Sequence, residues 1–414
     1  MIKRLLLGFL LGFALLLNSA VFAAVQPLKI VKYSPAIEPY VEALRHAQSP
    51  NDYIMSLFAK YDIVILAERD HREFTQWNNY IYNLVSDPRF IAQVGHIFTE
   101  YGSVYLQPKL DDFLNKDHLD RQAIIDILHD FLPSPSGWDR NNIYEFLQKF
   151  YILNQSLPAD SKVQLYFSDE PASWSGLDTQ YKYNIFYGMP GSGDFINPRD
   201  RIMAMRVFTK FKDIENSSDP RKKALVIMNS RHGFGYIKQL EDPKYAYFGQ
   251  NMGGYLIKWL PGRVANVMVH TVNEGSGPIK AHLLQDGKWD AAFAVMGDKP
   301  MGFDFKDTAF GKDSFDYGQI PETWGTYQDL FTGMVFFNPL REHMVYENIP
   351  GFFDENYKQL VRQREFMVCG ASCVKDIEAK WQDMKEHPEN YNKHRSYTDA
   401  FLAPMYHWLT LKHT

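Results

Sequence analysis

Carboxylates and histidines with the chemistry to activate water follow the predicted β-strands of this sequence. Residues 63–66 are a short run of aliphatic side chains, typical of a buried strand in a parallel sheet, and Glu68 and His71 follow it. An imidazole titrates near neutral pH and a nearby carboxylate can orient it, so His71 could act as a general base oriented by Glu68. The alternative is that Glu68 and Asp70 only favour the start of the next helix, by capping it and by interacting with its dipole.

Four further predicted strands are also followed by an acidic residue or a histidine. These strands cover residues 95–99, 162–167, 224–228 and 264–269, and the residues after them are Glu100, Asp169, His232 and His270. Parallel strands end at one edge of their sheet, which is where open α/β sheets bind ligands. We therefore expect these side chains to gather at one edge, although His232 and His270 could instead be structural.

A helix is predicted to begin at Pro198, because Asn197 can cap it and proline suits the first turn. Arg199 and Asp200 then lie in that first turn. Arg199 could stabilise an oxyanion, and we assign both residues to the catalytic group. The alternative is an ion pair that only supports the helix start.

Substrate binding is assigned to three residues near the same edge. Trp174 opens a stretch rich in glycine and aromatic residues, 174–195, and Asp169 and His270 follow predicted strands. The glycines of PGSGDF, residues 190–195, do not form a G-x-S-x-G nucleophile elbow and more simply permit a turn.

The order of predicted elements indicates an α/β fold, with a largely parallel sheet flanked by helices. Helices are expected over residues 50–60, 74–85, 111–131, 142–153 and 355–386, and a further strand within residues 330–337. We divide the chain into a signal peptide at 1–24, an α/β core domain at 25–275 that carries the site, and a loop-rich and helical extension or cap at 276–414. We expect this extension to pack on the sheet as part of the same globule.

The amino-terminal segment has the pattern of a secretory signal. Lys3 and Arg4 precede an apolar run at residues 5–17, and a small-x-small pattern predicts cleavage after Ala23 or Ala24. The alternative, an uncleaved membrane helix, is disfavoured because the run is short for a span. We expect an exported protein, periplasmic or secreted, with no transmembrane segment in the mature chain.

The composition is that of a globular protein, with 45% hydrophobic and 22% charged residues. Acidic residues outnumber basic ones by 49 to 44, and no basic cluster stands out, which argues against nucleic acid as a partner. A small molecule or a peptide is the expected substrate. The two cysteines, Cys369 and Cys373, suit a local disulfide in an oxidising compartment; free thiols or a chemical role are the alternatives.

The order and strand context of these motifs resemble those of the erythromycin esterase, ChaN-like and TIKI superfamily. The matching residues are Glu68 and His71 in AERDH, Glu100 in FTE, Asp169 in YFSDE, Arg199, Asp200, Met203 and Ala204 in RDRIMA, and His232 in NSRHG. Two positions depart from the pattern: Ala67 stands where the family usually has glycine, and His232 is alone where the erythromycin esterases carry two histidines.

The resemblance implies a hydrolytic or ligand-binding site above the sheet edge, since the family includes esterases that open macrolide lactones, metal-dependent proteases and a haem-binding protein. We predict a hydrolase that uses activated water on an ester, lactone or amide, with His71 as the base beside Glu68 and Glu100. The alternatives are a binder of haem or another small ligand without turnover, and an interaction protein that has lost activity.

A divalent metal ion, zinc or manganese, is a further expectation for this site. The candidate ligands are Glu68, His71, Glu100 and His232, because carboxylates and imidazoles are common ligands of both ions. Met203 and Met205 are more simply core residues than ligands.

Overall fold

The computed structural model describes residues 28–131, 141–169, 174, 177–187, 198–242, 244–245, 249–273, 281–317 and 322–412. The predicted signal peptide and Asn197 lie outside these residues. Among the described helices, none is both long enough and apolar enough to cross a membrane.

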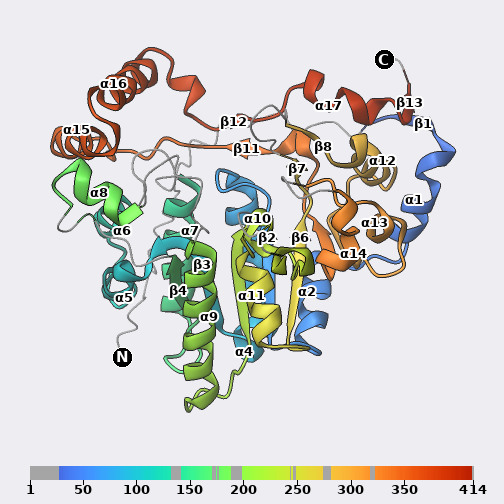
Figure 1. The fold of residues 1–414 in the computed structure, drawn as a ribbon, viewed down its shortest axis with the longest axis horizontal. Helices are drawn as coiled ribbons and strands as arrows, with labels where there is room; N and C mark the ends of the chain where they lie inside the picture. Colours follow the sequence, from blue (N-terminus) through green and yellow to red (C-terminus); the bar gives the residue numbers. More distant parts are fainter. Residues whose placement is uncertain are drawn as a thin grey trace, which may run out of the picture.

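A seven-stranded sheet forms the centre of the molecule (Figure 1). Its strands, in spatial order, are β4 (Gln164–Asp169), β3 (His96–Ser103), β5 (Ala224–Asn229), β2 (Ile63–Glu68), β6 (Val264–Val269), β10 (Gly333–Phe336) and β9 (Met301–Asp304). All neighbouring strands pair in parallel except β9, which is antiparallel to β10. The predicted α/β class with a largely parallel sheet is confirmed.

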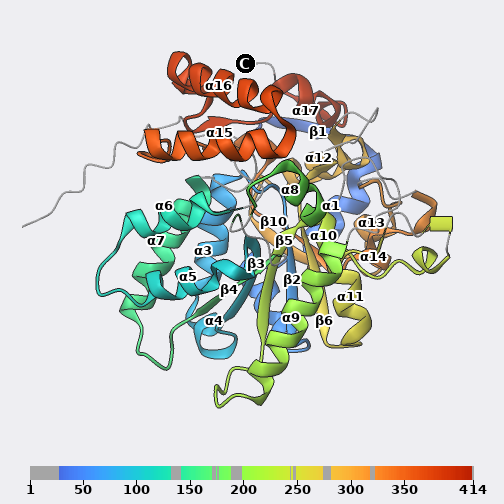
Figure 2. The ribbon, with the colours of Figure 1, turned by 60° about the vertical axis from the view of Figure 1, so that its left-hand side comes forward.

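Helices cover both faces of this sheet (Figures 1 and 2). Helices α9 (Pro198–Asn216) and α11 (Met252–Trp259) pack on the face that includes Ile63 and Ile65 of β2. Val64 and Leu66 point to the opposite face, which is covered by α2 (Pro50–Phe58), α3 (Tyr82–Val85), α5 (Gln107–Leu114), α6 (Arg121–His129) and α7 (Asn141–Ser156). Side chains of a strand alternate between the two faces of its sheet. Because helices cover both faces, β2 is buried throughout, which explains its unbroken apolar run.

Residues beyond 275 contribute the strands β9 and β10 to the sheet, and they also form the helices drawn above it in Figures 1 and 2. Beside β9 and β10, a third apolar cluster gathers around Trp289 and Phe293. It involves the helices α1 (Glu38–Leu44), α12 (Lys288–Val295), α13 (Ala309–Lys312), α14 (Tyr327–Leu330) and α17 (Asp399–Tyr406). Helices α15 (Glu355–Cys369) and α16 (Ala371–Glu386) lie across the top in both views.

The remaining elements are short. Besides several 3-10 turns, they include the helices α4 (Pro88–Gln93), α8 (Gln180–Tyr187) and α10 (Ser230–Gly233), the π-helical turn Gln76–Ile81, and the strand pairs β1 (Ile30–Tyr33) with β13 (Leu409–Leu411), β7 (Val272–Asn273) with β8 (His282–Leu283), and β11 (Met344–Val345) with β12 (His394–Arg395).

Two local predictions were wrong. The single helix expected over residues 111–131 is two helices, α5 and α6, because Asp120 caps a new helix by accepting from the backbone N–H of Ala123. The strand expected to end before Glu100 continues to Ser103, so Glu100 lies within β3.

The buried side chain of Asn266 joins β6 to segments far away in the sequence. Its amide donates to the carbonyls of Gly233, at 3.0 Å, and Leu330, at 2.7 Å, and its oxygen accepts from the backbone N–H of Thr332, at 3.1 Å. Because truncation removes these buried hydrogen bonds between distant segments, Asn266→Ala should lower the free energy of unfolding by about 2–4 kcal/mol in urea titrations. The exposed control Asn216→Ala should change it by less than about 0.5 kcal/mol. Equal stability of the two variants would contradict this role of Asn266.

Candidate functional site

The carboxylate of Glu100 is the centre of a buried polar cluster at the carboxyl edge of the sheet. Its Oε1 lies 2.9 Å from a guanidinium nitrogen of Arg199, 3.2 Å from Nε2 of His232 and 3.8 Å from Nε2 of His71. Its Oε2 accepts the backbone N–H of Asn229 at 2.9 Å. The side chain is fully buried, so these groups replace the water that a carboxylate otherwise requires.

Glu68 and His71 form a hydrogen-bonded dyad beside this centre. Nδ1 of His71 contacts Oε1 of Glu68, while Oε2 of Glu68 accepts from the indole N–H of Trp77 at 2.7 Å. The chain turns between the two residues, because the carboxylate of Asp70 accepts the backbone N–H of Arg72 at 2.8 Å. Asp70 therefore supports a local turn, and Glu68 is engaged with the imidazole rather than in a helix cap.

The buried side chain of Arg69 anchors the loop that carries His71 through hydrogen bonds. The Arg69 guanidinium donates to the carboxylate of Glu73 at 3.2 Å and to the carbonyl of Asn338 at 2.8 Å. From the other side, the side-chain amide of Asn142 donates to the carbonyl of His71 at 2.7 Å. The position of the imidazole is thus fixed by segments from three parts of the chain.

Two further pairs complete the cluster. Asp169, at the end of β4, binds Arg199 through both carboxylate oxygens, at 2.8 and 3.0 Å. Asp200 binds Nδ1 of His232 at 2.8 Å and accepts the backbone N–H of Met252 at 2.7 Å. Asp169 and Asp200 therefore orient the two cationic groups that face Glu100.

Burial and nearby charges shift the pKa values of Glu68 and Glu100 in opposite directions. Burial raises the pKa of Glu68 above its usual value, and the nearby His71 offsets this only in part. Burial acts in the same direction on Glu100, but His232, His71 and Arg199 outweigh it, and the pKa of Glu100 is held well below its usual value. A pair of acids with opposite shifts is typical of sites that use them for different tasks.

The pKa values of both histidines are raised above the usual value. Burial would lower the pKa of His71, but the charges of Glu68 and Glu100 outweigh it and raise that pKa. Burial acts likewise on His232, and the charges of Asp200 and Glu100 raise its pKa to about 9.

Three of the predicted ligands could hold a divalent ion. Glu68, His71 and Glu100 each offer one ligand atom, and these atoms lie within 4.8 Å of one another. Two carboxylates and an imidazole suit zinc or manganese in type. His232, predicted as a fourth ligand, is outside this group of three, since Asp200 binds its Nδ1 and its Nε2 faces Glu100.

Two residues assigned to substrate binding lie apart from the cluster. His270 is fully buried, with Nε2 3.3 Å from the carboxylate of Asp290, and its ring packs against Phe293 and Phe336. Trp174 stacks on Tyr183.

Trp174 also forms part of the wall of a cavity of about 840 Å³. Apolar side chains of Leu106, Leu177, Leu360 and Met367 line the same cavity, together with charged side chains that include Asp130, Arg362 and Arg364. A volume of this size is in the range that encloses small organic ligands.

Several supporting residues were missed from the sequence. Trp77 follows the apolar periodicity of a helix, and nothing in that pattern shows that its indole N–H reaches Glu68. Tyr101 and Asn142 both bind the carbonyl of His71 from distant segments. The order of residues carries no signal for such contacts, because they depend on how α7 and β3 pack.

Comparison with known proteins found no matching family model and no matching curated protein. Three solved structures are similar in chain arrangement. A Bacillus cereus protein has 12% identity over 75% of this chain and 94% of its own, with a TM-score of 0.39. A succinoglycan biosynthesis protein has 12% identity over 74% and 98%, with a TM-score of 0.42. ChaN of Campylobacter jejuni, whose structure shows cofacial haem binding, has 13% identity over 53% and 85%, with a TM-score of 0.33.

The opposite pKa shifts of the two glutamates predict that neutralising Glu100 destabilises the fold much more than neutralising Glu68. Glu100→Gln should lower the free energy of unfolding at pH 7 by about 3–5 kcal/mol, because Arg199 and His232 lose a buried partner. Glu68→Gln should cost less than about 1 kcal/mol, since the amide keeps the size of a side chain whose charge is disfavoured by burial. Urea unfolding of chelator-treated protein measures both.

The pH dependence provides the control. The pKa of Glu100 is lower when folded than when unfolded, so its charge stabilises the fold above the usual pKa of 4.5 and ceases to do so as the pH falls through the lowered value. The difference between wild type and Glu100→Gln should therefore shrink under acid conditions. A difference that stays constant with pH would show that the cost is steric.

Proposed function

We propose that this protein is a hydrolase in which the Glu68–His71 dyad activates water for attack on an ester, lactone or amide. The observation that carries the proposal is the placement of the His71 imidazole. Its Nδ1 is bound to a buried carboxylate, its Nε2 is on the side of Glu100, and its side chain is 16% exposed at the sheet edge. This is the arrangement of an oriented general base, and its Nε2 is itself buried on the side of Glu100.

The dyad assigns a role to each ring nitrogen. When Nδ1–H donates to Glu68, the lone pair of Nε2 is available to take a proton from water as the water adds to the carbonyl carbon of the substrate. The same nitrogen then returns the proton to the leaving oxygen or nitrogen. Arg199, fixed by Glu100 and Asp169, contributes a positive charge near the developing oxyanion.

The motif order, which resembles that of the erythromycin esterases, favours an ester or lactone within this class. A divalent ion held by Glu68, His71 and Glu100 would use the lone pair of His71, and the ion instead of the imidazole would then lower the pKa of a bound water. The roles of Arg199 in charge stabilisation and of Asp200 in orienting His232 are the same with or without such an ion.

Binding of haem or another apolar small ligand is the second candidate function. The observation that favours it is the cavity of about 840 Å³, whose wall combines apolar side chains such as Trp174 and Met367 with the cationic Arg362 and Arg364. Haem added to the purified protein would then give a visible absorption band that saturates at a fixed stoichiometry. A hydrolase without haem affinity would give only the spectrum of free haem.

Removal of the base tests the proposed hydrolase directly. His71→Ala should lower kcat/KM for model esters and lactones by about 100-fold or more, because general base catalysis is lost. The control His118→Ala removes an exposed histidine that pairs with the neighbouring Asp117, and should keep wild-type activity. Turnover in a folded His71→Ala variant at the wild-type rate would refute the role of the dyad.

Metal content is a separate prediction. Protein supplied with zinc or manganese should retain about one ion per chain after dialysis, and Glu100→Gln should lose most of it because one ligand has been neutralised. Elemental analysis measures the content, with His118→Ala as the control. Equal ion content in all variants would show that any ion binds elsewhere.

A further inference from the structure

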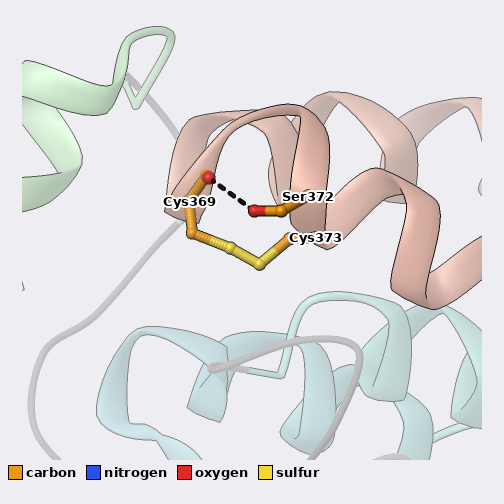
Figure 3. Close-up of a disulfide and its surroundings, with 3 residues drawn as sticks. All are labelled: Cys369, Ser372 and Cys373. Carbon is orange, nitrogen blue, oxygen red and sulfur yellow. Dashed lines mark hydrogen bonds between the residues drawn. A yellow bond between two sulfur atoms is a disulfide. The ribbon is translucent and has the colours of Figure 1, made fainter.

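The corner between α15 and α16 contains a chemical group that the proposed hydrolase does not use. Cys369, the last residue of α15, and Cys373, in the first turn of α16, are joined in a disulfide (Figure 3). The hydroxyl of Ser372 donates to the carbonyl of Cys369 at 3.3 Å and closes the turn. Cys369 is exposed and Cys373 is partly exposed, so a solvent thiol can reach the pair.

A buried carboxylate lies beside this disulfide. Glu365 is one helical turn before Cys369 on α15, and its carboxylate and both sulfurs lie within 4.8 Å of one another. Glu365 is only 8% exposed, and within the described part of the chain its carboxylate forms no hydrogen bond or ion pair. Burial, with the charge of Asp376, raises the pKa of Glu365 to about 7, which suits a group that exchanges protons near neutral pH.

The two sulfurs differ in their electrostatic surroundings. Cys373 is the third residue of the sixteen-residue helix α16, where the helix dipole stabilises a thiolate. Cys369 is at the carboxyl end of α15, where the dipole disfavours a thiolate and a proton acceptor is required. The structure therefore provides a good leaving group on one side and an acid–base partner on the other.

We propose that Cys369 and Cys373 form a dithiol–disulfide exchange centre, with Glu365 as the proton acceptor and donor for Cys369. The exchange partner is a small thiol of the glutathione class or a protein thiol. This activity is independent of the proposed hydrolase site, since within the described part of the chain neither Glu365 nor the two cysteines form a hydrogen bond or ion pair with the residues around Glu100.

The exchange proceeds in two balanced steps. A thiolate of the partner attacks Sγ of Cys369, the Cys369–Cys373 bond breaks, and Cys373 leaves as a thiolate. A second partner thiolate then attacks the partner sulfur of the mixed disulfide, and Cys369 leaves and takes a proton from Glu365. The pair gains two electrons, and two partner thiols are oxidised to one disulfide; the reverse sequence oxidises the pair.

The surrounding packing allows this exchange without unfolding. Tyr357 and Val361 of α15 and Ile377 of α16 belong to the main apolar core, so both helices stay attached when the disulfide opens. The disulfide closes a loop of only four residues, which contributes little to stability in the chain-entropy account.

Exchange kinetics of the native full-length protein test the proposal. Reduced protein is mixed with oxidised glutathione at pH 7, samples are quenched with N-ethylmaleimide, and mass spectrometry follows the Cys369 mixed disulfide and the closed pair. We expect both species in the wild type, and oxidation about tenfold slower or more in Glu365→Gln. The matched control is Glu378→Gln, which removes an exposed carboxylate bound to Arg362 and should oxidise at the wild-type rate.

Two results would overturn the proposal. One is a native disulfide that resists reduced glutathione for hours and opens only in denaturant, as a purely structural bridge does. The other is equal oxidation rates for the Glu365 and Glu378 variants. If Glu365→Gln does not fold, Cys373→Ser leaves Cys369 alone, and its failure to form a mixed disulfide with oxidised glutathione would also refute the proposal.

Discussion

The buried charge of Glu100 is the constraint on which the polar cluster depends. A carboxylate without water requires partners that replace it, and the fold supplies Arg199 from α9, His232 from α10 and the backbone of Asn229 from β5. Each partner comes from a different element, so the cluster forms only when the strands have the right order. The charge balance around Glu100 therefore depends on the order of the strands at the sheet edge.

The placement of His71 depends on a second buried charge. Arg69 lies two residues before it, and its guanidinium joins the loop to Glu73 and to Asn338, which follows β10. The segment after residue 275 thus supports the site as well as the sheet. A change at Asn338 would act on the imidazole through Arg69, which Asn338 binds through both its side chain and its carbonyl.

Much of the fold could be predicted because its causes are local. A strand that is buried on both faces must be apolar throughout, so β2 and β6 are visible in the sequence as aliphatic runs. The break that divides residues 111–131 into two helices was not predicted, because it depends on the cap formed by Asp120. The export signal stays a prediction, since residues 1–24 lie outside the described chain.

The sequence by itself determined that Glu68 and His71 are close, because they are three positions apart at the end of β2. Tertiary structure alone decided the contact of Glu100 with Arg199, across 99 residues, and the exclusion of His270. The physical reason is that a strand fixes where along the sheet a residue lies. The direction of its side chain depends on the alternation of the strand and on the neighbours that pack against it.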